Sequence, residues 1–191
     1  QMWAAQSFRL KPEQRMLNSG GMGAMGFALP TALGAAKASP DKQVIVIAGD
    51  GGIQVNIQEL DTIVKHNLQI KIFVMNNKNL GMVRVFQDLY FEGRQQSTVS
   101  GYSCPDLVGI AKAYGISSYS IYKWEDAEEI VISVLSSDGP VFVNIALDLE
   151  TVVNPKLVVN RPIEDMSPHL GRDELKGNMM IELVEEMDVL K

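Results

Sequence analysis

The feature that most constrains the fold is an alternation of short apolar runs with longer segments of helical periodicity. Two of the runs, VIVIAG and IKIFVM, are each about six residues long, which suits single strands. The segment at residues 57–65 instead places Ile57, Leu60, Ile63 and Val64 on one helical face. Strands that alternate with helices in this way build a parallel sheet with crossover helices, so the sequence predicts an α/β fold.

The expected elements follow from this periodicity along the chain. We expect strands at residues 44–48, 70–75, 118–121 and 141–147, and helices at 57–65, 80–91, 105–114 and 125–135, the third with Pro105 in its first turn. Beyond residue 148 three prolines interrupt a polar stretch, and residues 173–189 have the pattern of an acidic amphipathic helix. We therefore expect one domain over residues 1–150 and an extension over 151–191 that packs on it or on a partner.

Charge and composition exclude several classes of function. With 17 basic and 23 acidic residues the net charge is −6, which argues against nucleic acid as a partner. No apolar run reaches the roughly 18 residues of a membrane span, so no membrane partner is expected. The single cysteine, Cys104, cannot form an internal disulfide, which favours a reducing, cytoplasmic location. Because the chain starts at Gln1 and not at Met, we expect it to be part of a longer or processed protein.

A glycine pattern near the start has two interpretations. Gly21, Gly23 and Gly26 fit G-x-G-x-x-G, which binds dinucleotides only when a strand precedes it. The preceding KPEQRMLNS is polar and makes a poor core strand. In the second interpretation, the glycines allow close packing of the small, apolar segment at residues 27–38. We prefer this interpretation.

Polar residues follow two neighbouring strands at the points where each strand ends. Gly49, Asp50, Gly51 and Gly52 follow the strand at 44–48, and Asn77 follows the strand at 70–75. The carboxyl ends of parallel strands face the same crevice, so Asp50 and Asn77 can converge there. A carboxylate and an amide oxygen are hard ligands that suit Mg²⁺, which usually shares its shell with substrate phosphates. The alternative is that each motif is only a turn or a cap, but the pair at this spacing favours a magnesium diphosphate site.

These residues also carry a family resemblance. GDG, 24 residues and NN resemble the diphosphate motif of thiamine diphosphate enzymes, and GDGGIQVNIQELDTIVKHNLQIKIFVMNNKNLGMV resembles the acetohydroxyacid synthase (acetolactate synthase) branch. The resemblance extends through QMWAAQ and SGGMGAMGFALPTALGAA and covers most of residues 1–150. It implies a three-layer α/β/α fold with a mostly parallel sheet, with thiamine diphosphate and Mg²⁺ as cofactors.

The resemblance also implies roles for single residues. Asp50, the Asn77 side chain and the Asn79 carbonyl would bind the metal. The other implied positions line the cofactor: Gly21, Gly23, Met25, Gly49, Gly51, Gly52, Leu80, Gly81, Met82 and Val83. Met25 is similar to the apolar wedge that holds thiamine bent, although residue chemistry alone favours a core methionine. Phe86 occupies a position where this branch usually carries a tryptophan that helps to select the second 2-ketoacid.

The activating glutamate of the family belongs to a different domain, and no residue here matches it. Glu59 aligns with the helix after the diphosphate turn and is expected at a surface or packing edge. We therefore expect no catalytic residue in this chain, weak cofactor binding by the isolated chain, and a pyrimidine-binding domain of the same or another subunit as a partner, in a homodimer or homotetramer. Whether a flavin or a regulatory subunit is present stays open.

Three functional hypotheses remain at this point. The first is an enzyme that decarboxylates pyruvate and joins it to a second 2-ketoacid. The second keeps the cofactor in a 2-ketoacid decarboxylase or another thiamine-dependent ligase. The third is a non-catalytic assembly module, which an intact metal-ligand set disfavours.

Four further residues are given structural interpretations. His66 and His169 are expected at the surface, and Cys104 is not expected to be a nucleophile. Arg84 is expected to be a solvated helix residue, with contact to an anionic substrate as the alternative.

Overall fold

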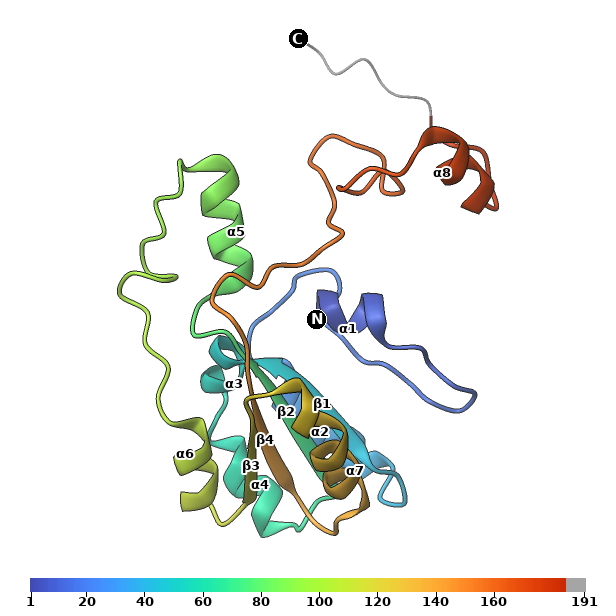
Figure 1. The fold of residues 1–191 in the computed structure, drawn as a ribbon. Coiled ribbons are helices and arrows are strands. Elements are labelled where there is room, and N and C mark those ends of the chain that lie inside the picture. The colour runs from blue at the N-terminus through green and yellow to red at the C-terminus, as the bar shows by residue number, and fades with distance from the viewer. Residues whose placement is uncertain (185–191) are drawn as a thin grey trace. The chain divides into compact units, whose positions relative to one another are not determined.

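The computed structural model describes residues 1–184 of the chain, which divides into two units, Gln1–Thr151 and Val152–Lys191. Among the described residues, no helix combines the length and apolar character needed to cross a membrane. The first unit contains the sheet and most of the helices (Figure 1).

A four-stranded, all-parallel sheet forms the centre of the first unit. Its strands are β1 (Val44–Gly49), β2 (Ile70–Asn76), β3 (Ser117–Ile121) and β4 (Val141–Ala146), in the spatial order β1-β2-β4-β3. The predicted strands are confirmed to within one residue at each end. Ile72 and Phe73 of β2 are both buried although they face opposite sides of the sheet. A strand covered on both faces needs apolar residues at every position, which explains why β2 reads as a continuous apolar run.

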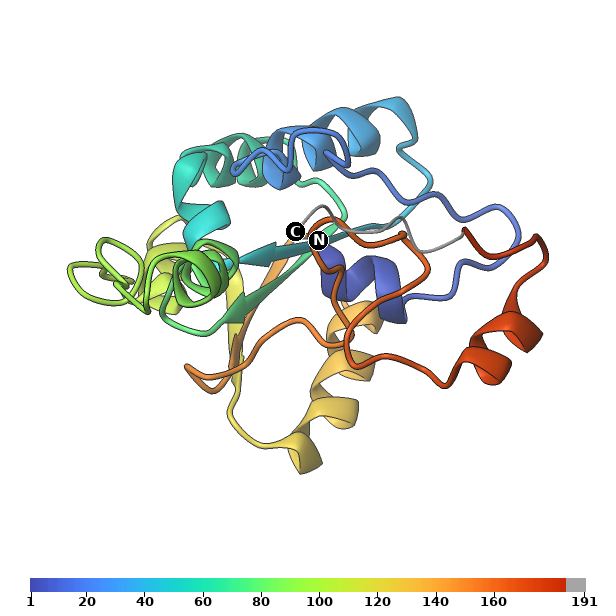
Figure 2. The ribbon, with the colours of Figure 1, turned by 90° about the horizontal axis from the view of Figure 1, so that it is seen from above.

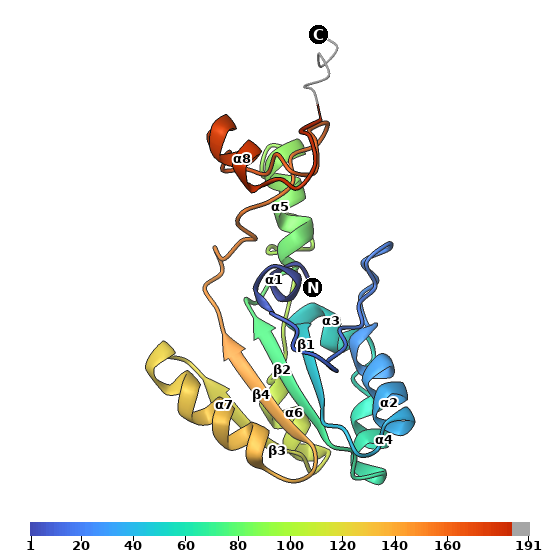
Figure 3. The ribbon, with the colours of Figure 1, turned by 90° about the vertical axis from the view of Figure 1, so that its right-hand side faces the viewer.

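Helices cover both faces of this sheet, so the predicted α/β/α layering is confirmed. Figures 2 and 3 show α7 on one side of the sheet and α2 and α4 on the other. One core lies under α2 (Ala28–Ala38), α3 (Asp50–Val55), α4 (Glu59–Lys65) and α6 (Leu107–Ala113). The second core lies under α7 (Ala127–Ser136), which a short 3-10 turn (Trp124–Asp126) precedes. The remaining helices of this unit are α1 (Met2–Ser7) and α5 (Gly81–Tyr90).

Three predicted helix starts are corrected. The helix expected from residue 125 begins at Ala127, after the 3-10 turn. The helix expected from residue 57 begins at Glu59, and its Leu60 and Ile63 are fully buried, as the spacing predicted. The helix expected from Pro105 begins at Leu107, because Asp106 is its N-cap and accepts a hydrogen bond from the Gly109 amide at 2.9 Å. Pro105 therefore lies before the cap and outside the first turn.

Lys71 is a charged residue within the buried strand β2. Its side chain is fully buried, and its Nζ donates to the carbonyls of Ser137 (2.7 Å) and Gly139 (2.6 Å) and to Ser137 Oγ (3.2 Å). Burial lowers the pKa of Lys71, and the nearby Asp138 acts in the opposite direction. An ammonium group has three protons to donate, so this lysine is fully satisfied and fixes the turn between α7 and β4.

The second unit has little regular structure within the described residues. A bridge pairs Lys156 with Ser167, and α8 spans Arg172–Asn178. The predicted helix over 173–189 is thus wrong at residues 179–184, where Met179 turns to an extended conformation after Gly177 and Asn178, both poor helix formers. Residues 185–189 of that prediction lie outside the described residues.

Buried Asp165 lies among basic side chains of this second unit. It contacts Arg172 and His169 at 3.1 Å each. Burial acts to raise the pKa of Asp165, but these two groups hold it below its ordinary value. His169 is exposed as predicted, and its partner is this carboxylate.

Candidate metal and diphosphate site

The site predicted from the sequence lies at the carboxyl end of the parallel sheet. Gly49 at the end of β1 is level with Met75 of β2, and Asn76 is level with Ala146 of β4. Asp50 follows β1 directly and begins α3, and Asn77 follows β2. This alignment brings the two side chains together, as strand order and direction predicted.

Three oxygen atoms meet at this point. The side-chain oxygen position of Asn77 is 3.1 Å from Asp50 Oδ1 and 3.0 Å from the carbonyl oxygen of Asn79. If the side-chain amide of Asn77 is rotated so that its oxygen and nitrogen exchange places, the nitrogen donates hydrogen bonds to both atoms. In that orientation the two acceptors are satisfied without a cation. With its oxygen inward, three acceptors converge and need a cation between them. Adjacent ligands of an octahedral Mg²⁺ at 2.0–2.1 Å are about 2.9 Å apart, so the spacing fits this ion.

Asp50 is the only charged member of this set. Its side chain is buried, with 1% of the residue exposed. Burial raises the pKa of Asp50, while hydrogen bonds from Tyr102 and from the backbone near Gly51 and Asn77 act in the opposite direction. No group of three His, Cys, Asp or Glu residues that could hold a metal occurs in residues 1–184. A cation here would keep excess positive charge, which an anionic ligand such as a diphosphate would neutralise.

Gly51 is enclosed by side chains from three other parts of the chain. A Cβ atom at Gly51 would collide with Leu80 Cδ2, and it would lie 3.1 Å from Met25 Cε and 3.5 Å from Tyr102 Oη. A Cβ atom at Gly52 would meet nothing within 4 Å. Of these two glycines, Gly51 alone requires the absence of a side chain for steric reasons, and its backbone marks the point where Met25 and Leu80 converge.

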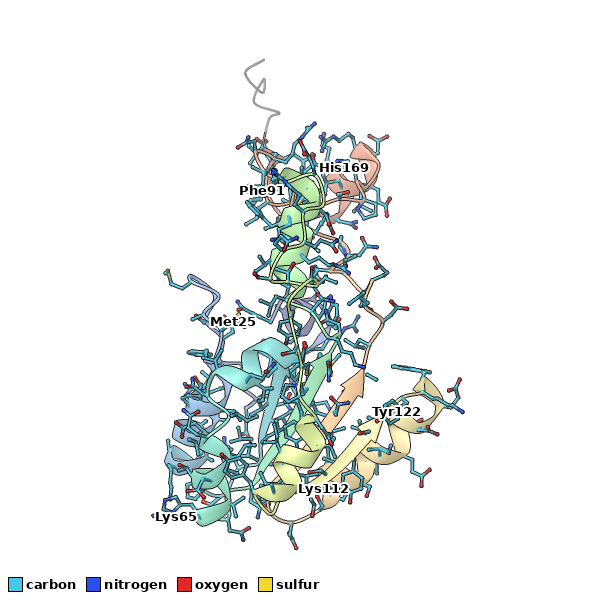
Figure 4. All side chains as sticks on the ribbon, turned by 90° about the vertical axis from the view of Figure 1, so that its left-hand side faces the viewer. Met25, Lys65, Phe91, Lys112, Tyr122 and His169 are labelled. Atoms are coloured by element: carbon cyan, nitrogen blue, oxygen red, sulfur yellow. The ribbon has the colours of Figure 1, made fainter. Side chains whose placement is uncertain are left out.

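Met25 lies on the loop before α2, with about half of the residue exposed. Figure 4 shows it at the end of the sheet from which α5 extends, opposite Lys65 and Lys112. Of the neighbouring glycines, Gly21 and Gly23 are exposed, and Gly23 has a φ of +60°. Gly26 is buried, its carbonyl accepts from Asn56 Nδ2 at 2.8 Å, and a Cβ there would overlap Val55 and Asn56.

The glycine pattern at 21–26 is thus not a dinucleotide fingerprint in this fold. No strand precedes it within the described residues, and Gly26 serves close approach to the end of α3. The packing interpretation is therefore supported at Gly26.

The turn after β2 is anchored to the segment that follows β4. Asn79 Nδ2 donates to the carbonyls of Asn77 at 3.0 Å and Leu149 at 3.1 Å. Arg84 Nη1 donates to the same Leu149 carbonyl and lies 3.8 Å from the Glu150 carboxylate. The prediction that Arg84 is solvated is wrong, because this carbonyl draws the guanidinium inward and only 2% of the residue is exposed.

Three residues predicted to contact the cofactor or the substrate lie on α5. Met82, Val83 and Phe86 are each about half exposed on this helix. The Phe86 ring packs on Tyr90 with 4.6 Å between centroids and on Phe91 with 6.0 Å. These three residues therefore lie on an exposed, apolar part of the helix, and their contacts with cofactor and substrate stay predictions.

Two residues of the site were missed by sequence reasoning. Tyr102 Oη donates to Asp50 Oδ2 at 2.9 Å, and Gln54 Nε2 donates to Tyr102 Oη and to the Asp50 carbonyl at 3.0 Å each. Gln54 could have been found, since it lies one helical turn after Asp50. Tyr102 lies 52 residues away in sequence, and no local pattern indicates it.

Cys104 also lies near this carboxylate, although its sequence neighbourhood did not indicate an acidic partner. Burial raises the pKa of the Cys104 thiol, and the negative charge of Asp50 adds to the rise. Both effects keep the sulfur protonated, which agrees with the prediction that Cys104 is not a nucleophile.

The fold and the position of the oxygen cluster define a parallel α/β protein whose candidate site lies at the carboxyl ends of its strands. Within that class, the chain belongs to the family described as "Thiamine pyrophosphate enzyme, C-terminal TPP binding domain", whose model matches residues 1–145. Thiamine pyrophosphate is thiamine diphosphate, so the family resemblance noted from the sequence is confirmed.

Curated relatives cover most of this chain. It is 38% identical over 188 residues to the probable acetolactate synthase large subunit of Methanococcus aeolicus, and the matched region covers 94% of this chain and 31% of the relative. It is 39% identical over 153 residues to the acetolactate synthase isozyme 2 large subunit of Escherichia coli K12, where the matched region covers 80% of this chain and 28% of the relative. Acetolactate synthase 2, chloroplastic, of Zea mays is 37% identical over 172 residues, covering 87% and 27%. The chain thus spans less than a third of the length of these relatives.

Proposed function

We propose that this chain is the diphosphate- and magnesium-binding domain of an acetolactate synthase-type enzyme, which decarboxylates pyruvate and joins it to a second 2-ketoacid. The observation that carries the proposal is the cluster of three oxygen atoms from Asp50, Asn77 and Asn79 at the carboxyl end of the sheet. The relatives are named as acetolactate synthases, which supports this reaction over that of a decarboxylase and over an assembly module. In this proposal residues 1–150 form the cofactor domain, and residues 151–191 pack on it or on a partner.

The roles proposed for the residues follow from their positions. Asp50, the Asn77 side chain and the Asn79 carbonyl hold Mg²⁺, and the cofactor diphosphate completes its shell. The backbone that lines the diphosphate comes from Gly49, Gly51, Gly52 and the turn of Leu80, Gly81, Met82 and Val83. When bound, thiamine diphosphate supplies an acidic carbon and an electron sink for decarboxylation and carbon–carbon bond formation. Met25 would give the bound cofactor an apolar contact, and Gly21 and Gly23 would contact its aminopyrimidine end.

The remaining parts of the active site come from outside this chain. We propose that a pyrimidine-binding domain of the same or another subunit supplies the activating glutamate, in a homodimer or homotetramer. Two of the relatives carry the name large subunit, which supports a further subunit as a partner. Phe86 is proposed to contact the second 2-ketoacid. The single cysteine, Cys104, supports a cytoplasmic location.

Calorimetric titration of this chain with thiamine diphosphate and Mg²⁺ tests the cofactor assignment. We expect heat of binding in the parent and none in Asp50→Ala, whereas Asp41→Ala, at an exposed position, binds as the parent does. An absence of heat in the parent would favour the assembly module. Adding the pyrimidine-binding domain in trans and assaying acetolactate from pyruvate tests the reaction, and carbon dioxide without acetolactate would favour a decarboxylase.

A further inference from the structure

The side chain that approaches Asp50 most closely from outside the two strand ends is Tyr102. It lies on the segment between α5 and α6, far in sequence from both strand ends. Its Oη donates to Asp50 Oδ2 at 2.9 Å, while Asp50 Oδ1 faces Asn77. The two carboxylate oxygens therefore face different side chains, Tyr102 at Oδ2 and Asn77 at Oδ1.

Gln54 fixes the direction of this hydrogen bond. Its Nε2 donates to Tyr102 Oη at 3.0 Å and also to the Asp50 carbonyl at 3.0 Å. Because the phenol oxygen accepts from Gln54, its own proton is directed to Asp50 Oδ2. Gln54 and Asp50 lie on the same helix, α3, so the phenol is held by a rigid element.

The hydroxyl of Tyr102 also lies beside Gly51. Its Oη would be 3.5 Å from a Cβ atom at Gly51, which would also meet Met25 and Leu80. The phenol oxygen therefore lies close to the point where these two side chains converge on the Gly51 backbone.

We infer that Tyr102 is a positioning residue that makes Asp50 a single-oxygen metal ligand and thereby favours Mg²⁺ over Ca²⁺. This inference rests on the proposed function, because it assumes a divalent cation at the oxygen cluster. Mg²⁺ requires near-ideal octahedral geometry, whereas Ca²⁺ accepts six to eight oxygens and often binds both oxygens of one carboxylate. A donor on Oδ2 holds the carboxylate with Oδ1 toward the oxygen cluster and weakens Oδ2 as a second ligand, which suits the smaller ion. Removing the phenol hydroxyl would release the carboxylate from this orientation and relax the preference.

The test compares Tyr102→Phe with the parent chain in calorimetric titrations of Mg²⁺ and of Ca²⁺, each with saturating thiamine diphosphate. Loss of a partner that orients a metal ligand costs roughly 10–100-fold in metal affinity. We expect at least about a 10-fold loss for Mg²⁺ and a smaller loss for Ca²⁺, so the ratio of the two affinities changes. Tyr122→Phe is the matched control, because Tyr122 is exposed and lies on the far side of the unit from Met25 (Figure 4). Equal losses for both ions, or none, would overturn the inference.

A second measurement separates this inference from the proposed function. In the metal-free chain, three-bond carbon couplings of Asp50 report whether its side chain occupies one rotamer. We expect one rotamer in the parent and in Tyr122→Phe, and averaging over several in Tyr102→Phe. If the parent bound neither ion, the proposed function would fail. The couplings would still decide whether Tyr102 positions Asp50, because they are measured without metal. An unchanged rotamer in Tyr102→Phe would refute the positioning role even where the parent binds both ions.

Discussion

Replacing Asp50 by asparagine separates two effects of the buried carboxylate: the folding stability that its charge costs, and the metal binding that its charge supports. The substitution keeps the size of the side chain, and the introduced amide can still accept from Tyr102 and donate to the Asn77 oxygen. Only the charge is removed. We therefore expect Asp50→Asn to fold, to lose metal-dependent stabilisation, and to be at least as stable as the parent when no metal is present.

The sign follows from the pKa of Asp50. Burial raises this pKa above its ordinary value of 3.8, so the folded state favours the protonated form. The stability gained from that preference is complete below pH 3.8 and is lost as the pH rises through the folded pKa. At neutral pH the metal-free parent bears the full cost of an ionised, buried carboxylate. The neutral amide avoids this cost, which for a poorly compensated buried group is about 1–2 kcal/mol.

The benefit to the parent comes from binding. At a ligand concentration of about 100 times Kd, binding to the folded state alone adds about 2.7 kcal/mol. For a chain of this length each kcal/mol shifts Tm by roughly 2–4 °C, so we expect a rise of about 5–11 °C in the parent and none in the variant.

Differential scanning calorimetry at pH 7, with and without Mg²⁺ and thiamine diphosphate, measures both effects in one experiment. A full ligand-induced rise in Asp50→Asn would show that the carboxylate is not a metal ligand. A metal-free variant clearly less stable than the metal-free parent would show that the buried charge is compensated by the protein itself. Either result would refute the reasoning.

Three further substitutions test the packing around the site. Gly51→Ala places a methyl group against Leu80 and should cost about 1–3 kcal/mol and weaken cofactor binding in calorimetry, whereas Gly34→Ala, on α2 with open space at its Cβ position, should weaken neither stability nor binding. Lys71→Met leaves buried carbonyls without their donor, and urea unfolding should show a loss of about 2–4 kcal/mol; an unchanged midpoint would contradict the structural role of this ammonium group. Arg84→Met removes a donor that anchors α5, with an expected loss of about 1–3 kcal/mol in the same assay, where a solvated arginine would cost almost nothing.

Much of the fold could be predicted because its signals are local. The runs around Val46 and Ile72 are long enough for strands and too apolar for exposed loops, and polar residues at their ends bound them. Helix starts were less certain, since capping by Asp106 depends on the backbone conformation of a single residue. The predicted helix after residue 173 ended early because its acidic periodicity takes no account of Gly177.

The oxygen cluster was accessible from the sequence because a parallel sheet places the ends of neighbouring strands together. Asp50 and Asn77 needed only strand direction and strand order to be paired. The positions of Met82, Val83 and Phe86 in the active site rest on family resemblance alone, and the structure presents them on an exposed helix surface.

The sequence by itself determined the sheet, its layers and the residues at its carboxyl end, because hydrophobic periodicity and strand polarity act over a few residues. Only the tertiary structure decided which side chains surround those residues. Tyr102 reaches Asp50, and Arg84 is drawn to the Leu149 carbonyl, across many residues of intervening chain. Such contacts depend on how the chain returns to the sheet after each helix, and a local pattern carries no record of that path. The oxygen cluster could therefore be predicted, but the side chains that orient and anchor its members could not.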